Sequence, residues 1–179
     1  GKARFDALAS NIFKEQTQLR SVAAAPDFVV TMTYPLAGNE KAIGLDYRNN
    51  ADQWNAVRRA METGRLVLAG PLDLVQGGQG LIGRFPVYTG EDKARTFWGI
   101  VSAVIDVEKL YRDSGIQRAA TSLDIAIIGH DGKGNGGKRF FGPDLAGRSA
   151  VSAYVALPSG TWQILAAPKT GWVVSSAQT

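Results

Sequence analysis

The first 22 residues carry apolar side chains at intervals of three, four and seven positions. The series consists of Phe5, Leu8, Ile12, Leu19 and Val22. This spacing places the side chains on one stripe of an α-helix, so the pattern predicts an N-terminal helix over residues 5–25. The stripe fits two roles equally well, packing onto the rest of the fold or forming the seam of a helical dimer.

A second helix is predicted from residue 50 to residue 62. Asn50 can cap its first turn, and Gly64 follows its last turn. Gln53 stands three positions after Asn50, the spacing of a capping box. Two interpretations of Gln53 remain open, because its amide can complete that capping box or can face a pocket and offer a donor and an acceptor.

Most other apolar segments are short, rich in β-forming residues and bounded by turn residues, which is typical of strands. They cover residues 27–36, 40–47, 65–70, 72–76, 80–88 and 97–106, and then 122–129, 151–157 and 158–168. Glycine-rich turns join successive strands, which favours antiparallel sheets. The sequence therefore predicts an α+β fold with two sheet-containing parts, residues 26–118 and 119–179.

Two glycine-rich segments have spacings that nucleotide-binding loops also use. Gly78 to Gly83 matches G-x-G-x-x-G, but Pro86 and the β-forming residues around it follow where a dinucleotide site needs a helix. Gly132 to Lys138 has the spacing of a P-loop, but Arg139 stands where a Ser or Thr would hold magnesium. Both segments are therefore predicted to be turns.

Composition excludes several kinds of chemistry. The chain of 179 residues has no cysteine and a single histidine, His130, in a turn, so disulfides, thiolate metal sites and a nucleophile–base pair are not expected. We expect no enzyme activity, metal or cofactor. The net charge of +4 comes from scattered charges, which does not indicate a nucleic-acid partner, and no apolar run reaches the roughly 20 residues of a membrane span.

Arg84 stands in an otherwise apolar predicted strand, on the same face as Ile82 and Pro86. In one interpretation it lies on an edge strand and extends its guanidinium to water. In the other, it lines a pocket and binds an acidic or polar ligand group. The residues alone weigh these two interpretations equally.

Four segments resemble the CHASE sensory domain: "YPLAGNEKAIGLDY", "AMETGRLVLAGPLDLVQGGQGLIGRFPVY", "FWGIVSAVIDVEKL" and "LPSGTWQILAAPKTGW". The resemblance implies a periplasmic or extracytoplasmic input module set between two membrane helices of a histidine kinase, diguanylate cyclase or related protein. It also implies a stalk helix over residues 1–25 and two PAS-like parts. The membrane-distal part, residues 26–118, would hold the ligand, and the membrane-proximal part would be residues 119–179.

The plant cytokinin receptors carry a similar stretch, and their ligand contacts correspond to Gln53, Ala69, Val75 and Arg84. Trp98 is expected to add an aromatic surface. Gln53 suits a purine, because a Gln amide can pair with adenine, whereas Arg84 favours a small acid. The expected partners are therefore a purine-like or acidic small molecule and a second copy through the stalk helix. The alternative is a ligand-free structural or dimerisation module.

Overall fold

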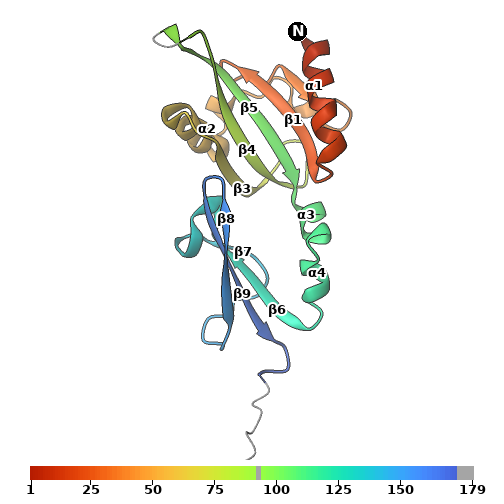
Figure 1. Cartoon of the computed structure of the whole chain (residues 1–179), viewed down its shortest axis with the longest axis vertical. Coiled ribbons are helices and arrows are strands. Elements are labelled where there is room, and N and C mark those ends of the chain that lie inside the picture. Colours follow the sequence, from red (N-terminus) through yellow and green to blue (C-terminus); the bar gives the residue numbers. More distant parts are fainter. Residues whose placement is uncertain (92–93, 173–179) are drawn as a thin grey trace, which may run out of the picture. The chain divides into compact units, whose positions relative to one another are not determined.

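The computed structural model describes residues 1–91 and 94–172, which form two compact units (Figure 1). Unit 1 comprises Gly1–Leu110, and unit 2 begins at Tyr111. The sequence placed this division between residues 118 and 119. The structure places it earlier, inside the helix α3 (Val107–Asp113), which follows the last strand of unit 1 without a loop.

Unit 1 is built on a five-stranded antiparallel sheet with the order β2-β1-β5-β4-β3. The strands are β1 (Leu19–Pro26), β2 (Met32–Tyr34), β3 (Val67–Asp73), β4 (Gln79–Thr89) and β5 (Thr96–Asp106). The helices are α1 (Lys2–Glu15) and α2 (Ala51–Thr63). Strands β1, β5 and β4 each have a neighbour on both sides, so they form the interior of the sheet.

The prediction of a long N-terminal helix is wrong. Helix α1 has 14 residues and ends at Glu15, and Leu19 and Val22 belong to β1. Pairing of β1 with both β2 and β5 buries five consecutive residues from Ser21 to Ala25. This burial and the hydrogen-bonded ladder outweigh the helix propensity of the three successive alanines in the segment.

Helix α1 packs on the sheet through one side only. Ala9 is buried, and the ring of Phe13 lies 5.4 Å from the ring of Tyr34 in an edge-to-face contact. Leu8 and Ile12 remain 60% and 47% exposed. Ala9 and Phe13 therefore pack onto the sheet, whereas Leu8 and Ile12 form an exposed apolar strip.

Several predicted strands of unit 1 differ from the structure. Residues 65–70 and 72–76, predicted to be two strands, form the single strand β3, which ends at Asp73, so residues 74–76 lie in a loop. Within residues 27–36 only β2 forms a strand, because Asp27 and Phe28 have positive φ angles of 45° and 68° and reverse the chain; Val29 forms an isolated β-bridge with Asp46. Residues 40–47, predicted to be extended, form two 3₁₀ turns, η1 (Glu40–Ala42) and η2 (Tyr47–Asn49). In η2, the Oδ1 atom of Asp46 accepts a hydrogen bond from the Arg48 backbone N–H at 3.0 Å.

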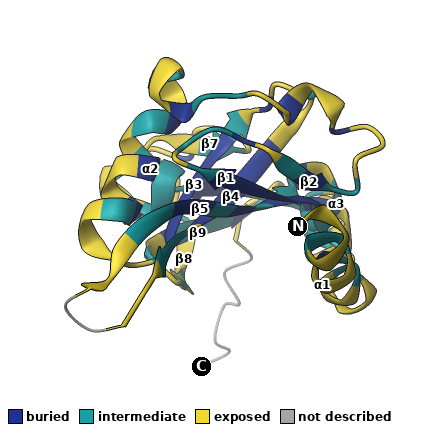
Figure 2. Cartoon of the chain, turned by 90° about the horizontal axis from the view of Figure 1, so that it is seen from above, coloured by how far each residue is buried: buried dark blue, intermediate teal, exposed yellow. Residues whose placement is uncertain are grey.

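The prediction for α2 is confirmed at both ends. The Oδ1 atom of Asn50 accepts a hydrogen bond from the Gln53 backbone N–H at 3.2 Å, and Gly64 ends the helix in the left-handed conformation. Val57 and Ala60 pack into the core of unit 1, between α2 and the face of the sheet that α2 covers, called the inner face below. Figure 2 shows the buried residues gathered on the strands while most of α1 is exposed.

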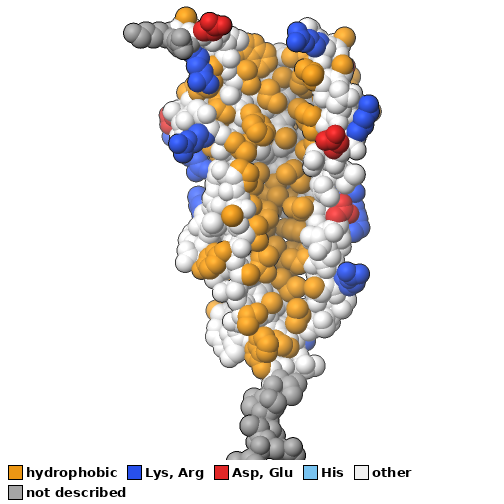
Figure 3. Space-filling view, in the orientation of Figure 1, with side chains coloured by type: hydrophobic (Ala, Val, Ile, Leu, Met, Phe, Trp, Pro, Cys, Tyr) orange, Lys and Arg blue, Asp and Glu red, His pale blue; other side chains and the backbone are white. Residues whose placement is uncertain are grey.

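The G-x-G-x-x-G segment is a hairpin, as predicted. Strands β3 and β4 pair, and the loop Leu74–Gly78 joins them, with Gly77 and Gly78 at positive φ. Gly83 lies inside β4 rather than before a helix. On the outer face of this sheet, hydrophobic side chains gather over β4 and β5 in the part of Figure 3 that shows unit 1.

Unit 2 contains a four-stranded antiparallel sheet with the order β7-β6-β9-β8. Its elements are α4 (Ile116–Ala119), β6 (Leu123–Ile128), β7 (Arg139–Phe141), β8 (Val151–Leu157) and β9 (Gly160–Pro168). The second glycine-rich segment forms the turns η4 (His130–Gly132) and η5 (Gly134–Gly136) between β6 and β7. The prediction that it is a loop is therefore confirmed.

Candidate functional site

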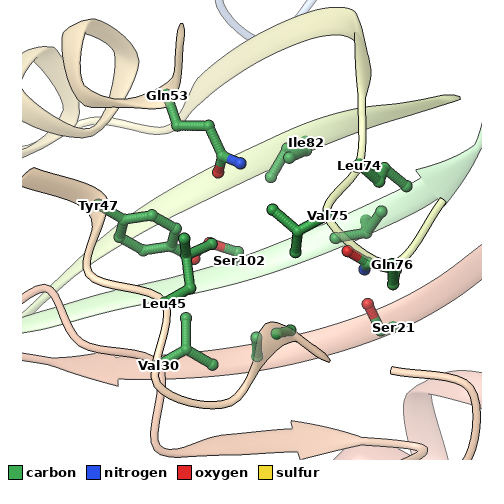
Figure 4. Close-up of a pocket in the computed structure, with 13 residues that line it drawn as sticks. Ser21, Val30, Leu45, Tyr47, Gln53, Leu74, Val75, Gln76, Ile82 and Ser102 are labelled. Atoms are coloured by element: carbon green, nitrogen blue, oxygen red, sulfur yellow. The ribbon is translucent and has the colours of Figure 1, made fainter. Parts of the chain in front are cut away.

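A small pocket lies on the inner face of the unit 1 sheet, between α2 and two loops (Figure 4). Its volume of about 30 Å³ leaves room for one or two water molecules. Five lining residues carry a hydroxyl or an amide: Ser21, Tyr47, Gln53, Gln76 and Ser102. The remaining lining residues are aliphatic: Ala23, Val30, Ala42, Leu45, Leu74, Val75, Ile82 and Val104.

The side chain of Gln53 takes the second of the two roles that the sequence left open, because it faces a pocket. Its backbone N–H is capped by Asn50, but its side chain does not complete a capping box, because the Asn50 backbone N–H donates to the Tyr47 carbonyl. The side chain is 4% exposed and lines the pocket, and its Oε1 atom accepts a hydrogen bond from Arg84 Nη2 at 2.8 Å. The side-chain amide of Gln53 is therefore part of the pocket wall, and the buried guanidinium of Arg84 holds it in place.

Arg84 is fully buried, at 0% exposure, on the interior strand β4. The interpretation of an edge-strand arginine that reaches water is therefore wrong. Its guanidinium carbon lies 5.7 Å from the centroid of the Tyr47 ring, a cation–π distance. Arg84 does not line the pocket itself, but its positive charge lies one hydrogen bond behind the Gln53 amide.

Tyr47 and Ser102 form a polar pair in the wall of the pocket, and the sequence pattern identified neither of them. Tyr47 Oη lies 3.0 Å from Ser102 Oγ, a buried hydrogen bond. Ser102 pairs with Arg84 across the ladder from β5 to β4, so both side chains lie on the inner face. The signal for Ser102 was present, because it is the polar residue between Ile100 and Val104 on the buried face of an apolar strand.

The loop Leu74–Gly78 covers one side of the pocket. Arg20 on β1 donates from Nη1 to the Gly77 carbonyl at 2.5 Å and from Nη2 to the Gln76 carbonyl at 3.0 Å. On its other side, Gln76 Nε2 donates to Asn39 Oδ1 at a long 3.4 Å. The loop is therefore tied to the sheet by an arginine and to the neighbouring loop by a weak amide contact.

The other predicted site residues lie at different distances from the pocket. Val75 lines it. Ala69 is buried on β3 opposite Ile82, on the same face of the sheet, but is not a lining residue. Trp98 lies near the start of β5, where its carbonyl accepts a hydrogen bond from the Asp27 N–H, and it does not line the pocket.

A charged pair flanks the pocket tyrosine in sequence. Arg48 donates from Nε and Nη2 to the carboxylate of Asp46, and this hydrogen bonding lowers the pKa of that carboxyl below its usual value. Within residues 1–91 and 94–172, no cluster of histidine and acidic side chains has the geometry of a metal site. The site thus consists of hydroxyls, amides and aliphatic walls, with a buried cation behind them.

The sequence model of the CHASE domain matches residues 2–141. A search of the curated proteins gives no match. Among the described residues, no helix is long and apolar enough to cross a membrane.

Three solved structures share the fold at low sequence identity. An extracellular ligand binding receptor from Desulfohalobium retbaense aligns with a TM-score of 0.65 and 16% identity over 91% of this chain, which spans 32% of the receptor. A second structure is the ligand binding domain of the Pseudomonas aeruginosa amino acid chemoreceptor PctC in complex with GABA. It aligns with a TM-score of 0.59 and 16% identity over 93% of this chain and 80% of that domain.

The sensor domain of the Vibrio cholerae histidine kinase DctB gives a TM-score of 0.56 and 12% identity over 93% of this chain and 78% of that domain. The two antiparallel sheets thus resemble those of PAS-like sensor domains. This chain has the fold of extracellular sensor domains from chemoreceptors and histidine kinases.

Proposed function

The chain belongs to the CHASE domain family, and from that premise we propose that unit 1 binds a small polar ligand in the pocket walled by Gln53. CHASE domains are sensory and not catalytic. The parent would be a membrane-anchored signalling protein, such as a histidine kinase or a diguanylate cyclase. The chain would be its periplasmic or extracytoplasmic input, with unit 1 distal and unit 2 proximal to the membrane.

The observation that carries this proposal is the buried hydrogen bond between Arg84 and Gln53 at the pocket wall. Burying a guanidinium is costly unless its surroundings compensate the charge. In many proteins such costly polar groups persist where they serve a site. A wall of two amides and three hydroxyls offers both donors and acceptors to a ligand, while the aliphatic residues exclude water from it.

Two ligand classes fit this wall. A small acid would be favoured by the positive charge of Arg84, acting directly or through the polarised amide of Gln53. A purine would pair with that amide through one donor and one acceptor. GABA, the ligand of the PctC domain, carries a carboxylate, so we place the small acid first.

Ligand entry requires the pocket to enlarge. A volume of about 30 Å³ is far below the roughly 300 Å³ or more of ordinary ligand sites. The side of the loop Leu74–Gly78 that faces Asn39 is the part most suited to move, because a single amide contact at 3.4 Å joins it to Asn39, whereas Arg20 ties the loop to β1. Binding signals only if the ligand favours one arrangement over another. The lining strand β5 continues directly into α3, which provides a covalent path to unit 2.

The test is a thermal-shift screen of amino acids, organic acids and purines, followed by calorimetry. A ligand at 100 times its dissociation constant adds about 2.7 kcal/mol to the free energy of unfolding. Gln53→Glu should abolish binding of an acid, because the introduced side-chain carboxylate would neutralise Arg84 and repel the carboxylate of the ligand. A purine would lose only the hydrogen bond from the Gln53 side-chain NH₂ group and should bind about tenfold more weakly.

The matched control is Gln117→Glu, because Gln117 is an exposed glutamine of α4 outside the pocket. This variant should bind as the original chain does. A ligand that binds Gln53→Glu with unchanged affinity would contradict the proposed site. Melting curves that stay flat for every compound would favour the ligand-free structural or dimerisation module.

A further inference from the structure

Strand β8 forms an edge of the unit 2 sheet that lacks the usual protection of edge strands. Its seven residues, Val151–Leu157, read VSAYVAL and include no charge, proline or glycine. Natural proteins blunt exposed edges with charges, prolines, bulges or very short strands, because an open edge recruits other strands. The opposite edge, β7, is blunted in this way, since it has three residues and begins with Arg139.

The two sheets of the chain differ by one strand at this same edge. In unit 1 the order is β2-β1-β5-β4-β3, and β3 pairs with the outer side of β4. In unit 2 the order β7-β6-β9-β8 repeats this arrangement but ends at the strand equivalent to β4. Residues 142–150, which precede β8, form no strand, so no described strand of the chain takes the position that β3 takes in unit 1.

The backbone of β8 faces this open position with a symmetric set of groups. The residues Pro158 and Ser159 form the turn to β9, so Leu157 and Gly160 flank a two-residue hairpin loop. In such a hairpin the flanking residues form a hydrogen-bonded pair, and hydrogen-bonded residues then alternate along the strand. The N–H and C=O groups of Ser152, Tyr154 and Ala156 therefore point away from β9, equally spaced about Tyr154.

We propose that β8 pairs in antiparallel fashion with β8 of a second copy of this chain, with the two-fold axis at Tyr154. In this register Tyr154 lies opposite itself and Ser152 lies opposite Ala156, so roughly six backbone hydrogen bonds form. An uncharged strand can face itself without like-charge repulsion. The pairing covers Tyr154 and Val151, which are 63% and 56% exposed. It is isologous, so it closes as a dimer rather than growing into a fibre.

A cysteine placed at the axis tests this register, because the chain has no cysteine of its own. In Tyr154→Cys the two Cα atoms would lie about 5.5 Å apart, within the range of a disulfide. In the matched control Val151→Cys, each residue lies opposite Leu157 and the two sulfurs are separated by about 20 Å. Mild oxidation should convert Tyr154→Cys to a covalent dimer and leave Val151→Cys a monomer. Equal cross-linking of both variants, or of neither, would overturn the proposal.

A charge pair gives an independent test without cross-linking. Tyr154→Lys and Tyr154→Glu should each lose the dimer in sedimentation velocity, because identical charges meet at the axis. An equimolar mixture should regain a dimer that contains one copy of each variant. All measurements use the Ile12→Glu background, so that association through the exposed strip of α1 does not contribute. A mixture that remains monomeric, or single variants that still dimerise, would contradict pairing at Tyr154.

Discussion

Replacing Gln53 with alanine tests how strongly the buried guanidinium depends on the pocket wall. The substitution removes the Oε1 atom that accepts from Arg84 Nη2 at 2.8 Å. Hydrogen bonds to charged groups contribute about 1.5–3 kcal/mol, and the loss is at the upper end when the remaining partner is buried. Since Arg84 is fully buried, we expect the free energy of unfolding to fall by about 2–3 kcal/mol.

The assay is urea unfolding of the chain followed by tryptophan fluorescence, with Trp54 on α2 reporting on unit 1. Gln53→Glu keeps an acceptor for Arg84 and should retain most of the stability that Gln53→Ala loses. Gln79→Ala removes an exposed glutamine of the same sheet and should change the free energy by no more than about 0.5 kcal/mol. If Gln53→Ala behaves like Gln79→Ala, the bond between Gln53 and Arg84 does not support the fold.

Three further predictions concern the surroundings of the pocket. Asn50→Ala should lower the free energy of unfolding by about 1 kcal/mol, since it removes the cap of α2; no change in urea unfolding would contradict this. Because Arg48 lowers the pKa of Asp46, the pair stabilises the fold above the ordinary carboxyl pKa of about 3.9, and this contribution disappears as the pH falls through the lowered value. In Asp46→Asn the melting temperature should therefore fall less steeply as the pH is lowered through this range. An equally steep fall in the variant would contradict the role of the pair. Arg20→Ala should speed amide hydrogen exchange around Gln76, whereas unchanged exchange would show that Arg20 does not hold the loop.

Local sequence signals predicted the elements that depend on local interactions. The cap at Asn50 and the stop at Gly64 define α2 because their hydrogen bonds and backbone angles lie within a few residues of each other. The hairpin at Gly77 and Gly78 was likewise predictable, since positive φ angles favour glycine. The succession of strands predicted two sheet-containing parts, and the resemblance to the CHASE domain added the expectation that both are PAS-like.

Elements that depend on distant partners were predicted less well. Residues 19–26 are extended because β2 and β5 pair on either side, and both lie outside the predicted helical stripe. Tyr47 was missed as a site residue because its role comes from the hydrogen bond to Ser102, 55 positions away. The burial of Arg84 depended on the strand order, which places β4 between β3 and β5. The residue pattern alone could not distinguish that interior strand from an edge.

The most direct test of the ligand site is the structure of the chain with a compound that passes the thermal-shift screen. We expect the compound to lie on the inner face of the unit 1 sheet, in contact with Gln53, Tyr47 and Ser102. We also expect the pocket to be enlarged and Gln76 to be separated from Asn39. A compound bound elsewhere, with the pocket still about 30 Å³ in volume, would contradict the claim that this pocket is the sensory site.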